Sequence, residues 1–279
     1  MISKNLAQRL IVAAIACPAI IFLVFAGGDI FLYFILLLAG IGLWEYLRAE
    51  GVPVSGPLFW VPMIGVLSAV YFSARGLTET GLWSLLIVFL LVGTFLATGR
   101  DPIDVLYRKM VSITWGSFYL GLLYPFLFRI RGEAGWLEPA PGRWRLFYLI
   151  GALWIGDTAA MAVGKYFGKR KLAPAVSPGK TVEGFLGGYA GILLVSIVFK
   201  LFWMPELLWL HYLALTVIIG TFGQLGDLVE SLWKRAAGLK DSSAVIPGHG
   251  GVLDRFDSLI YSAPVVYFYL KYAVSVVCP

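Results

Sequence analysis

The stretch LLWLHYLALTVIIGTFGQLG, residues 207–226, lies between Glu206 and Asp227 and contains no Asp, Glu, Lys or Arg. A helix needs about 20 consecutive apolar residues to cross the hydrocarbon core of a bilayer. The end of the stretch nearest Asp227 carries Gly223, Gln224 and Gly226, whose small or polar side chains suit a cavity wall better than a lipid-facing surface. The stretch therefore predicts a membrane-spanning helix with a cavity at its polar end.

Similar charge-free gaps recur along the chain. The clear ones run from Arg9 to Asp29, Glu50 to Arg75, Glu79 to Arg100 and Lys109 to Arg129, and the shorter or interrupted ones are residues 30–47, ending in Glu45, 146–164, 184–204 and 258–277. We expect an all-α, polytopic integral membrane protein with about nine transmembrane helices. About four of them lie in residues 1–109, and residues 110–279 form a catalytic region with polar loops at 165–183 and 226–258.

The composition excludes an ordinary soluble domain. Hydrophobic residues make up 59% of the 279 residues and charged residues 14%, with a mean hydropathy of +0.84, whereas soluble domains are about 25% charged. The two cysteines, Cys17 and Cys278, lack the spacing of a disulfide framework or a zinc site.

The distribution of basic residues predicts the orientation. With nine spans, 15 of the 22 Lys and Arg residues fall on the side that holds the N-terminus, and an excess of basic residues marks the cytoplasmic side. We therefore expect the N-terminus and both polar loops to be cytoplasmic. The net charge of +6 favours contact with anionic lipid headgroups and nucleotides.

The densest polar stretch follows the opening helix directly. Helical spacing places Asp227, Glu230 or Ser231, and Lys234 on one face, because residues three or four apart are neighbours. A helix end that surfaces into water with internal ion pairs would show the same pattern. Ionisable groups at membrane depth are nevertheless candidates for function, and the same holds for Asp157 in its apolar run.

Residues 238–251 form a loop that closes on His249, Gly250 and Gly251. Glycines let backbone amides approach and face an anion, although a flexible connector is the alternative. Asp254 and Asp257 then lie one turn apart at the start of the last helix, where they could cap it or complement its dipole. Together with Asp227 they supply the hard oxygen ligands that Mg²⁺ takes beside phosphates.

The other polar loop contains Ser177-Pro178-Gly179-Lys180-Thr181. It is not a Walker A motif, because Pro174 stands where the first glycine is required and no strand is expected before it. It can still place a lysine and hydroxyl groups on a phosphate at the start of a helix.

These residues resemble the signature of the bacterial-type phosphatidate cytidylyltransferases, the CDP-diacylglycerol synthases. The matching positions are Ser231, Lys234-Arg235, Lys240-Asp241, His249-Gly250-Gly251, Asp254-Arg255 and Asp257, and Asp157-Thr158 and residues 177–181 look like the upstream elements of the family.

The resemblance implies a homodimeric enzyme of the bacterial inner membrane that transfers CMP from CTP to phosphatidic acid. It implies Mg²⁺ held by Asp227 and Asp254, with a monovalent cation such as K⁺ as an assistant, and no nucleic-acid partner. The predicted catalytic residues are Asp227, Lys234, Arg235, Lys240, Asp241, His249, Asp254, Arg255 and Asp257. The predicted substrate-binding residues are Asp157, Ser177, Lys180, Thr181, Ser231, Gly250 and Gly251. A CTP-dependent lipid kinase and an ion-coupled transporter using Asp157 and Asp227 remain alternatives.

Overall fold

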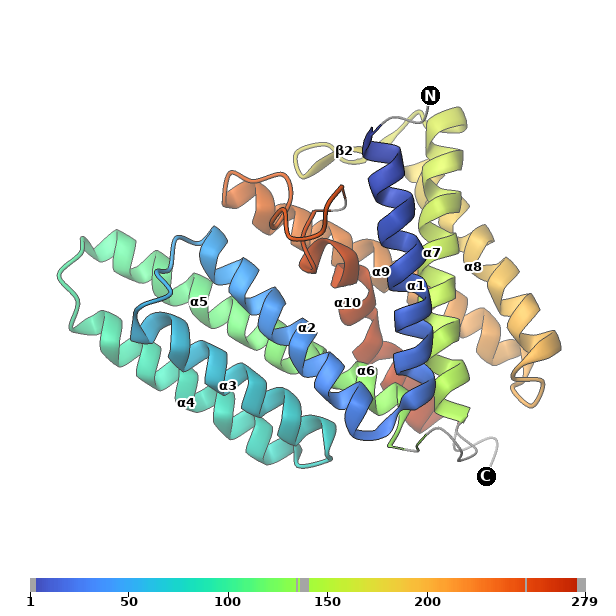
Figure 1. Ribbon diagram of the computed structural model, residues 1–279. Helices are drawn as coiled ribbons and strands as arrows, with labels where there is room; N and C mark the ends of the chain where they lie inside the picture. Colours follow the sequence, from blue (N-terminus) through green and yellow to red (C-terminus); the bar gives the residue numbers. More distant parts are fainter. Residues whose placement is uncertain (1–3, 134, 136–140, 249, 275–279) are drawn as a thin grey trace. The chain divides into compact units, whose positions relative to one another are not determined.

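The computed structural model describes residues 4–133, 135, 141–248 and 250–274. Helices dominate these residues (Figure 1). They are α1 (Lys4–Ala26), α2 (Gly28–Ala49), α3 (Pro57–Ala74), α4 (Thr78–Ala97), α5 (Ile103–Leu123), α6 (Pro125–Arg131), α7 (Pro141–Phe167), α8 (Val182–Phe202), α9 (Trp209–Ala236), α10 (Leu253–Tyr269) and a π-helical turn at Leu270–Val274. The prediction of an all-α membrane protein is confirmed.

Each of the nine expected spans corresponds to a helix. Among the described residues, seven helices are long and apolar enough to cross a membrane: α2, α3, α4, α5 continued by α6, α7, α8 and α9. The first expected span falls on α1, in which residues Val12–Ala26 are an apolar helical stretch. The last falls on α10, which has 17 residues and continues as the π-helical turn.

The chain forms two compact units. The first comprises Met1–Arg129 and Asp241–Arg255, and the second comprises Ile130–Lys240 and Phe256–Pro279. The chain therefore passes between the units three times, so that the segment after α9 belongs with the N-terminal helices. The sequence also predicts that the catalytic region begins at residue 110, and that boundary stays a prediction.

Within the first unit, α3 and α4 run side by side (Figure 1). Small residues allow this close approach: a side chain added at Gly65 would meet Val88, and one added at Gly81 would meet Ser73 and lie 2.9 Å from the Ala69 carbonyl oxygen. Such small residues are typical of helix interfaces in membranes, where backbones must come close to gain packing energy.

Within the second unit, α7 and α8 are packed in the same way. A Cβ at Gly184 would lie 2.7 Å from the Ala160 carbonyl oxygen, and one at Gly191 would lie 2.9 Å from that of Ile155. The two backbones therefore touch along glycine positions, which fixes the rotation of α7 and the direction in which its Asp157 points.

The connection between α7 and α8 corrects one expectation. No strand was expected near Gly179, but β1 (Lys171–Ala173) and β2 (Ser177–Thr181) form an antiparallel hairpin. The carboxylate of Glu183 accepts hydrogen bonds from the backbone N–H groups of Lys169 and Arg170 at 3.0 and 3.1 Å. The hairpin is thus tied to the first turn of α8, where free N–H groups also favour an acidic side chain.

Helices α9 and α10 come together in the second unit at Gly226. A Cβ there would lie 2.6 Å from the Tyr261 Cβ and 3.0 Å from the Asp257 carbonyl oxygen. This glycine brings the backbone that carries Asp227 against the backbone that carries Asp257.

Candidate active site

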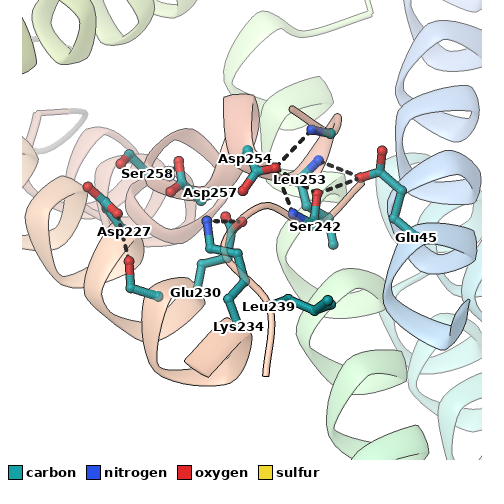
Figure 2. Close-up of polar contacts among 12 residues, drawn as sticks. Glu45, Asp227, Glu230, Lys234, Leu239, Ser242, Leu253, Asp254, Asp257 and Ser258 are labelled. Atoms are coloured by element: carbon teal, nitrogen blue, oxygen red, sulfur yellow. Dashed lines mark hydrogen bonds and ion pairs between the residues drawn. The ribbon is translucent and has the colours of Figure 1, made fainter. Parts of the chain in front are cut away.

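Asp227 on α9 is the centre of the polar cluster in the second unit. Its Oδ2 lies 2.7 Å from the Lys180 Nζ. Its Oδ1 accepts a hydrogen bond from the Ser231 hydroxyl at 3.2 Å, which is the contact drawn at Asp227 in Figure 2. Lys180 also donates to the Gln224 carbonyl oxygen at 3.5 Å. Three predicted site residues, Lys180 in β2 and Asp227 and Ser231 on α9, therefore lie in contact with one another through Asp227.

One turn further along α9, Lys234 pairs with Glu230 at 3.1 Å, and both side chains are largely buried. Together with the contact between Ser231 and Asp227, this pair confirms that the polar residues of α9 share a face. Asp257 on α10 completes the group, because its carboxyl group interacts with Asp227, Glu230 and Lys234.

A small cavity of about 10 Å³ borders the cluster in the second unit. Gly223 and Gln224 line it together with Asp157, Gly156 of α7 and Gly188 of α8. Gly226, the third residue predicted for the cavity wall, packs against α10 instead. The Gln224 amide donates to Asp157 Oδ1 at 3.4 Å. Asp157 therefore faces a polar partner in a glycine-lined cavity.

In the first unit, Asp254 fastens the polar loop onto the start of α10. Its Oδ2 accepts hydrogen bonds from the Ser242 N–H at 2.8 Å, the Ser242 hydroxyl at 2.9 Å and the Gly251 N–H at 2.8 Å (Figure 2). Asp254 lies within the first turn of α10, and its Oδ2 accepts hydrogen bonds from the loop that precedes the helix.

Two glycines of the signature are required by this arrangement. Gly250 has a φ of +81°, which L side chains rarely adopt, and a Cβ there would lie 2.8 Å from Asp254 Oδ2. A Cβ at Gly251 would meet the Ser242 hydroxyl and lie 2.7 Å from both carboxylate oxygens of Glu45. The loop closes tightly because neither position carries a side chain.

The remaining predicted residues are less constrained. Arg235, Lys240, Asp241 and Arg255 are exposed, and the Arg235 guanidinium donates to the Leu239 carbonyl oxygen at 3.0 Å. Thr181 caps α8 by accepting from the Gly184 N–H at 3.0 Å, and Ser177 pairs with Ala173 in the hairpin. His249 lies outside the described residues.

Glu45 on α2 is the residue that sequence reasoning missed. It is 1% exposed, and its carboxylate accepts hydrogen bonds from the signature loop, defined here as residues 241–252, and from the first residue of α10. The available signal was its position: a glutamate inside an otherwise apolar span is costly to bury. We expected only that it ended the second span.

The described residues contain no group of three or more His, Cys, Asp or Glu side chains gathered closely enough to hold a metal ion. Two carboxylates of the second unit are paired with ammonium groups, Asp227 with Lys180 and Glu230 with Lys234.

The fold and these sites define an integral membrane protein with paired carboxylates and lysines at the end of a membrane-spanning helix. A family model described as the cytidylyltransferase family matches residues 7–273, so the chain belongs to that family. The resemblance found in the signature is thereby confirmed.

Curated relatives cover nearly the whole chain. The phosphatidate cytidylyltransferase of Bacillus subtilis (strain 168) is 34% identical over 273 residues, which is 95% of this chain and 98% of the relative. Those of Staphylococcus saprophyticus and Staphylococcus aureus (strain COL) are 35% and 34% identical, and each alignment covers 92% of this chain and 96% of the relative.

Proposed function

We propose that the chain is a phosphatidate cytidylyltransferase, which transfers CMP from CTP to phosphatidic acid and forms CDP-diacylglycerol and pyrophosphate. The observation that carries this conclusion is the match over residues 7–273 together with relatives of that name along almost the whole chain. The carboxylate and lysine cluster around Asp227 lies in the matched region.

The reaction needs little acid–base chemistry from the protein. A phosphate oxygen of phosphatidic acid attacks the α-phosphorus of CTP, a new P–O bond forms, and the bond to the bridging oxygen of the β-phosphate breaks, so that pyrophosphate leaves with the electron pair. Because the attacking phosphate is already an anion at neutral pH, catalysis depends mainly on positioning and charge neutralisation.

The basic residues supply part of that neutralisation. Lys180 is held beside Asp227 at 2.7 Å and is only partly exposed, which fixes its ammonium group before a substrate arrives. Arg235, Lys240 and Arg255 are exposed, so a triphosphate can reach their cationic groups. We assign these four side chains to substrate phosphates.

Mg²⁺ is the cofactor we propose, with Asp227 and Asp254 as its ligands, following the signature. The chemistry of the donors fits, because Asp227 already faces a cation and interacts electrostatically with the carboxyl groups of Asp157 and Asp257. Carboxylate oxygens are the ligands that Mg²⁺ takes. When bound, the ion would neutralise charge on the phosphates, and K⁺ is proposed only as an assistant.

We also propose that the protein is a homodimer of the bacterial inner membrane with the N-terminus and the loops at 165–183 and 226–258 in the cytoplasm. The excess of Lys and Arg on that side supports the orientation. CTP would then reach the site from the cytoplasm, while phosphatidic acid and other membrane lipids remain in the bilayer.

The direct test uses purified protein in lipid vesicles with CTP, Mg²⁺ and phosphatidic acid. Pyrophosphate release that requires all three supports the proposal. The control replaces phosphatidic acid by diacylglycerol, which lacks the attacking phosphate. Release that is equal in the control, or absent with phosphatidic acid, would overturn it.

A further inference from the structure

The carboxylate of Glu45 accepts hydrogen bonds from one short part of the chain, and Figure 2 shows those from Ser242 and Leu253. Oε1 accepts from the Ser243 hydroxyl at 2.6 Å and the Val252 N–H at 2.9 Å. Oε2 accepts from the Ser242 hydroxyl at 3.1 Å and the Leu253 N–H at 3.0 Å. Each carboxylate oxygen therefore lies within hydrogen-bond distance of two donor groups.

The burial of this carboxylate makes its hydrogen bonds necessary. A carboxylate that is 1% exposed loses nearly all its hydration, and such burial is tolerated only when the group is fully hydrogen-bonded. These four donors, two hydroxyls and two backbone N–H groups, are neutral. Two of them are backbone N–H groups at the start of α10, which have no partner within the helix and lie at the positive end of its dipole.

The contact continues from Glu45 to Asp254 through one side chain. The Ser242 hydroxyl lies 3.1 Å from Glu45 Oε2 and 2.9 Å from Asp254 Oδ2. Because a hydroxyl donates a single hydrogen, it links the two carboxylates without satisfying both at once. Any shift of Glu45 therefore reaches Asp254 through Ser242.

Glycines allow the close packing around the contact between Glu45 and Ser242. Besides Gly251, whose missing Cβ makes space for Ser242 and Glu45, α2 has Gly42 one turn before Glu45. A Cβ at Gly42 would lie 3.0 Å from the Leu253 Cδ2. Helix α2 thus has a small residue, Gly42, beside the Leu253 side chain, and an acceptor, Glu45, for the backbone N–H of the same residue.

We propose that Glu45 is a positioning residue of the transfer reaction: it holds the signature loop and the start of α10 in place, and so fixes the orientation of Asp254. This inference rests on the proposed function. It assigns to the N-terminal helices, far from the signature in sequence, a part in the chemistry.

Glu45→Gln is the decisive variant, because it keeps the shape of the side chain but replaces one acceptor oxygen by an NH₂ group. Whichever way the amide turns, two donors face a donor. We expect kcat to fall about ten- to a hundredfold, the usual loss when a residue that orients a ligand is changed. Amide hydrogen exchange at Val252 and Leu253 should become faster while exchange in α7 and α8 stays unchanged.

The matched control is Tyr46→Phe on the same helix, which removes a hydroxyl that contacts Ser112 at 3.1 and 3.3 Å. It should leave kcat within about twofold of wild type. A double variant of Glu45→Gln with Ser243→Ala should lose little more than Glu45→Gln alone, because residues of one network are not additive. Additive losses would show that the two side chains act independently.

The proposal is overturned if Glu45→Gln has near-wild-type kcat, or if exchange at Val252 and Leu253 is unchanged. If this variant does not accumulate, Ser242→Ala tests the same link, and wild-type kcat there overturns it too. A wild-type protein without transferase activity would refute the proposed function, whereas the exchange measurement still decides the role of Glu45 in holding the loop.

Discussion

Glu45 accepts a hydrogen bond from the backbone N–H of Val252 at 2.9 Å, although the two residues are 207 positions apart in the sequence. The contact joins the second helix of the chain to the loop that carries the family signature. The signature is therefore held by residues outside it, and substitutions can separate its chemical role from its structural one.

Asp254→Asn separates the two roles of Asp254. The asparagine carbonyl oxygen can still accept from the loop, as Oδ2 does now, but the negative charge is lost. If Asp254 holds Mg²⁺, turnover should fall on the order of a thousandfold, because several kcal/mol of charge stabilisation disappear. The measurement is CDP-diacylglycerol formation by variant protein whose melting temperature matches wild type; near-normal activity would reduce Asp254 to a loop anchor.

Gly251→Ala should damage the signature loop. Its Cβ would meet Ser242 and both oxygens of Glu45, and overpacking of this kind costs about 1–3 kcal/mol. We expect a lower melting temperature and lower activity. Gly93→Ala is the control, because a Cβ there meets nothing within 4 Å; equal behaviour of the two variants would contradict the tight loop.

Lys180→Ala should lower kcat/KM for CTP by about ten- to a hundredfold, because it removes a fixed cation and leaves Asp227 without its partner at 2.7 Å. Arg170→Ala is the matched control in the same hairpin. Arg170 pairs with Glu183 at 3.4 Å but is mostly exposed, and exposed pairs contribute about 0–1 kcal/mol. Equal losses in both variants would point to a general effect of charge.

Removal of divalent cations tests the metal assignment. Excess EDTA should abolish turnover, and added Mg²⁺ should restore it, because the phosphates need an oxygen-ligated cation. Activity that persists in EDTA would exclude the proposed role of Asp227 and Asp254 as Mg²⁺ ligands.

Much of the fold could be predicted because membrane-spanning helices have a simple sequence pattern. Charge-free gaps of about 20 residues predict spans without any knowledge of packing, and each of them falls on a helix. The face shared by Asp227 and Ser231 also follows from helical spacing alone.

The hairpin and Glu45 could not be predicted in the same way. The strands are three and five residues long, and β2, Ser177–Thr181, contains a proline and a glycine, which strands disfavour. Backbone pairing and Glu183 hold the hairpin together. Glu45 acts through contacts about two hundred positions away, and no local pattern indicates such a distance.

The position of the label that CTP transfers distinguishes cytidylyl transfer from the two alternatives. Purified protein in vesicles with Mg²⁺ and phosphatidic acid is given CTP labelled at either the α- or the γ-phosphorus. We predict that the α-label appears in the lipid product and the γ-label in pyrophosphate. Transfer of the γ-label to lipid would identify a lipid kinase and refute the proposed cytidylyl transfer. No transfer of either label, with a substrate gradient dissipated across the vesicles, would identify a transporter and refute it as well.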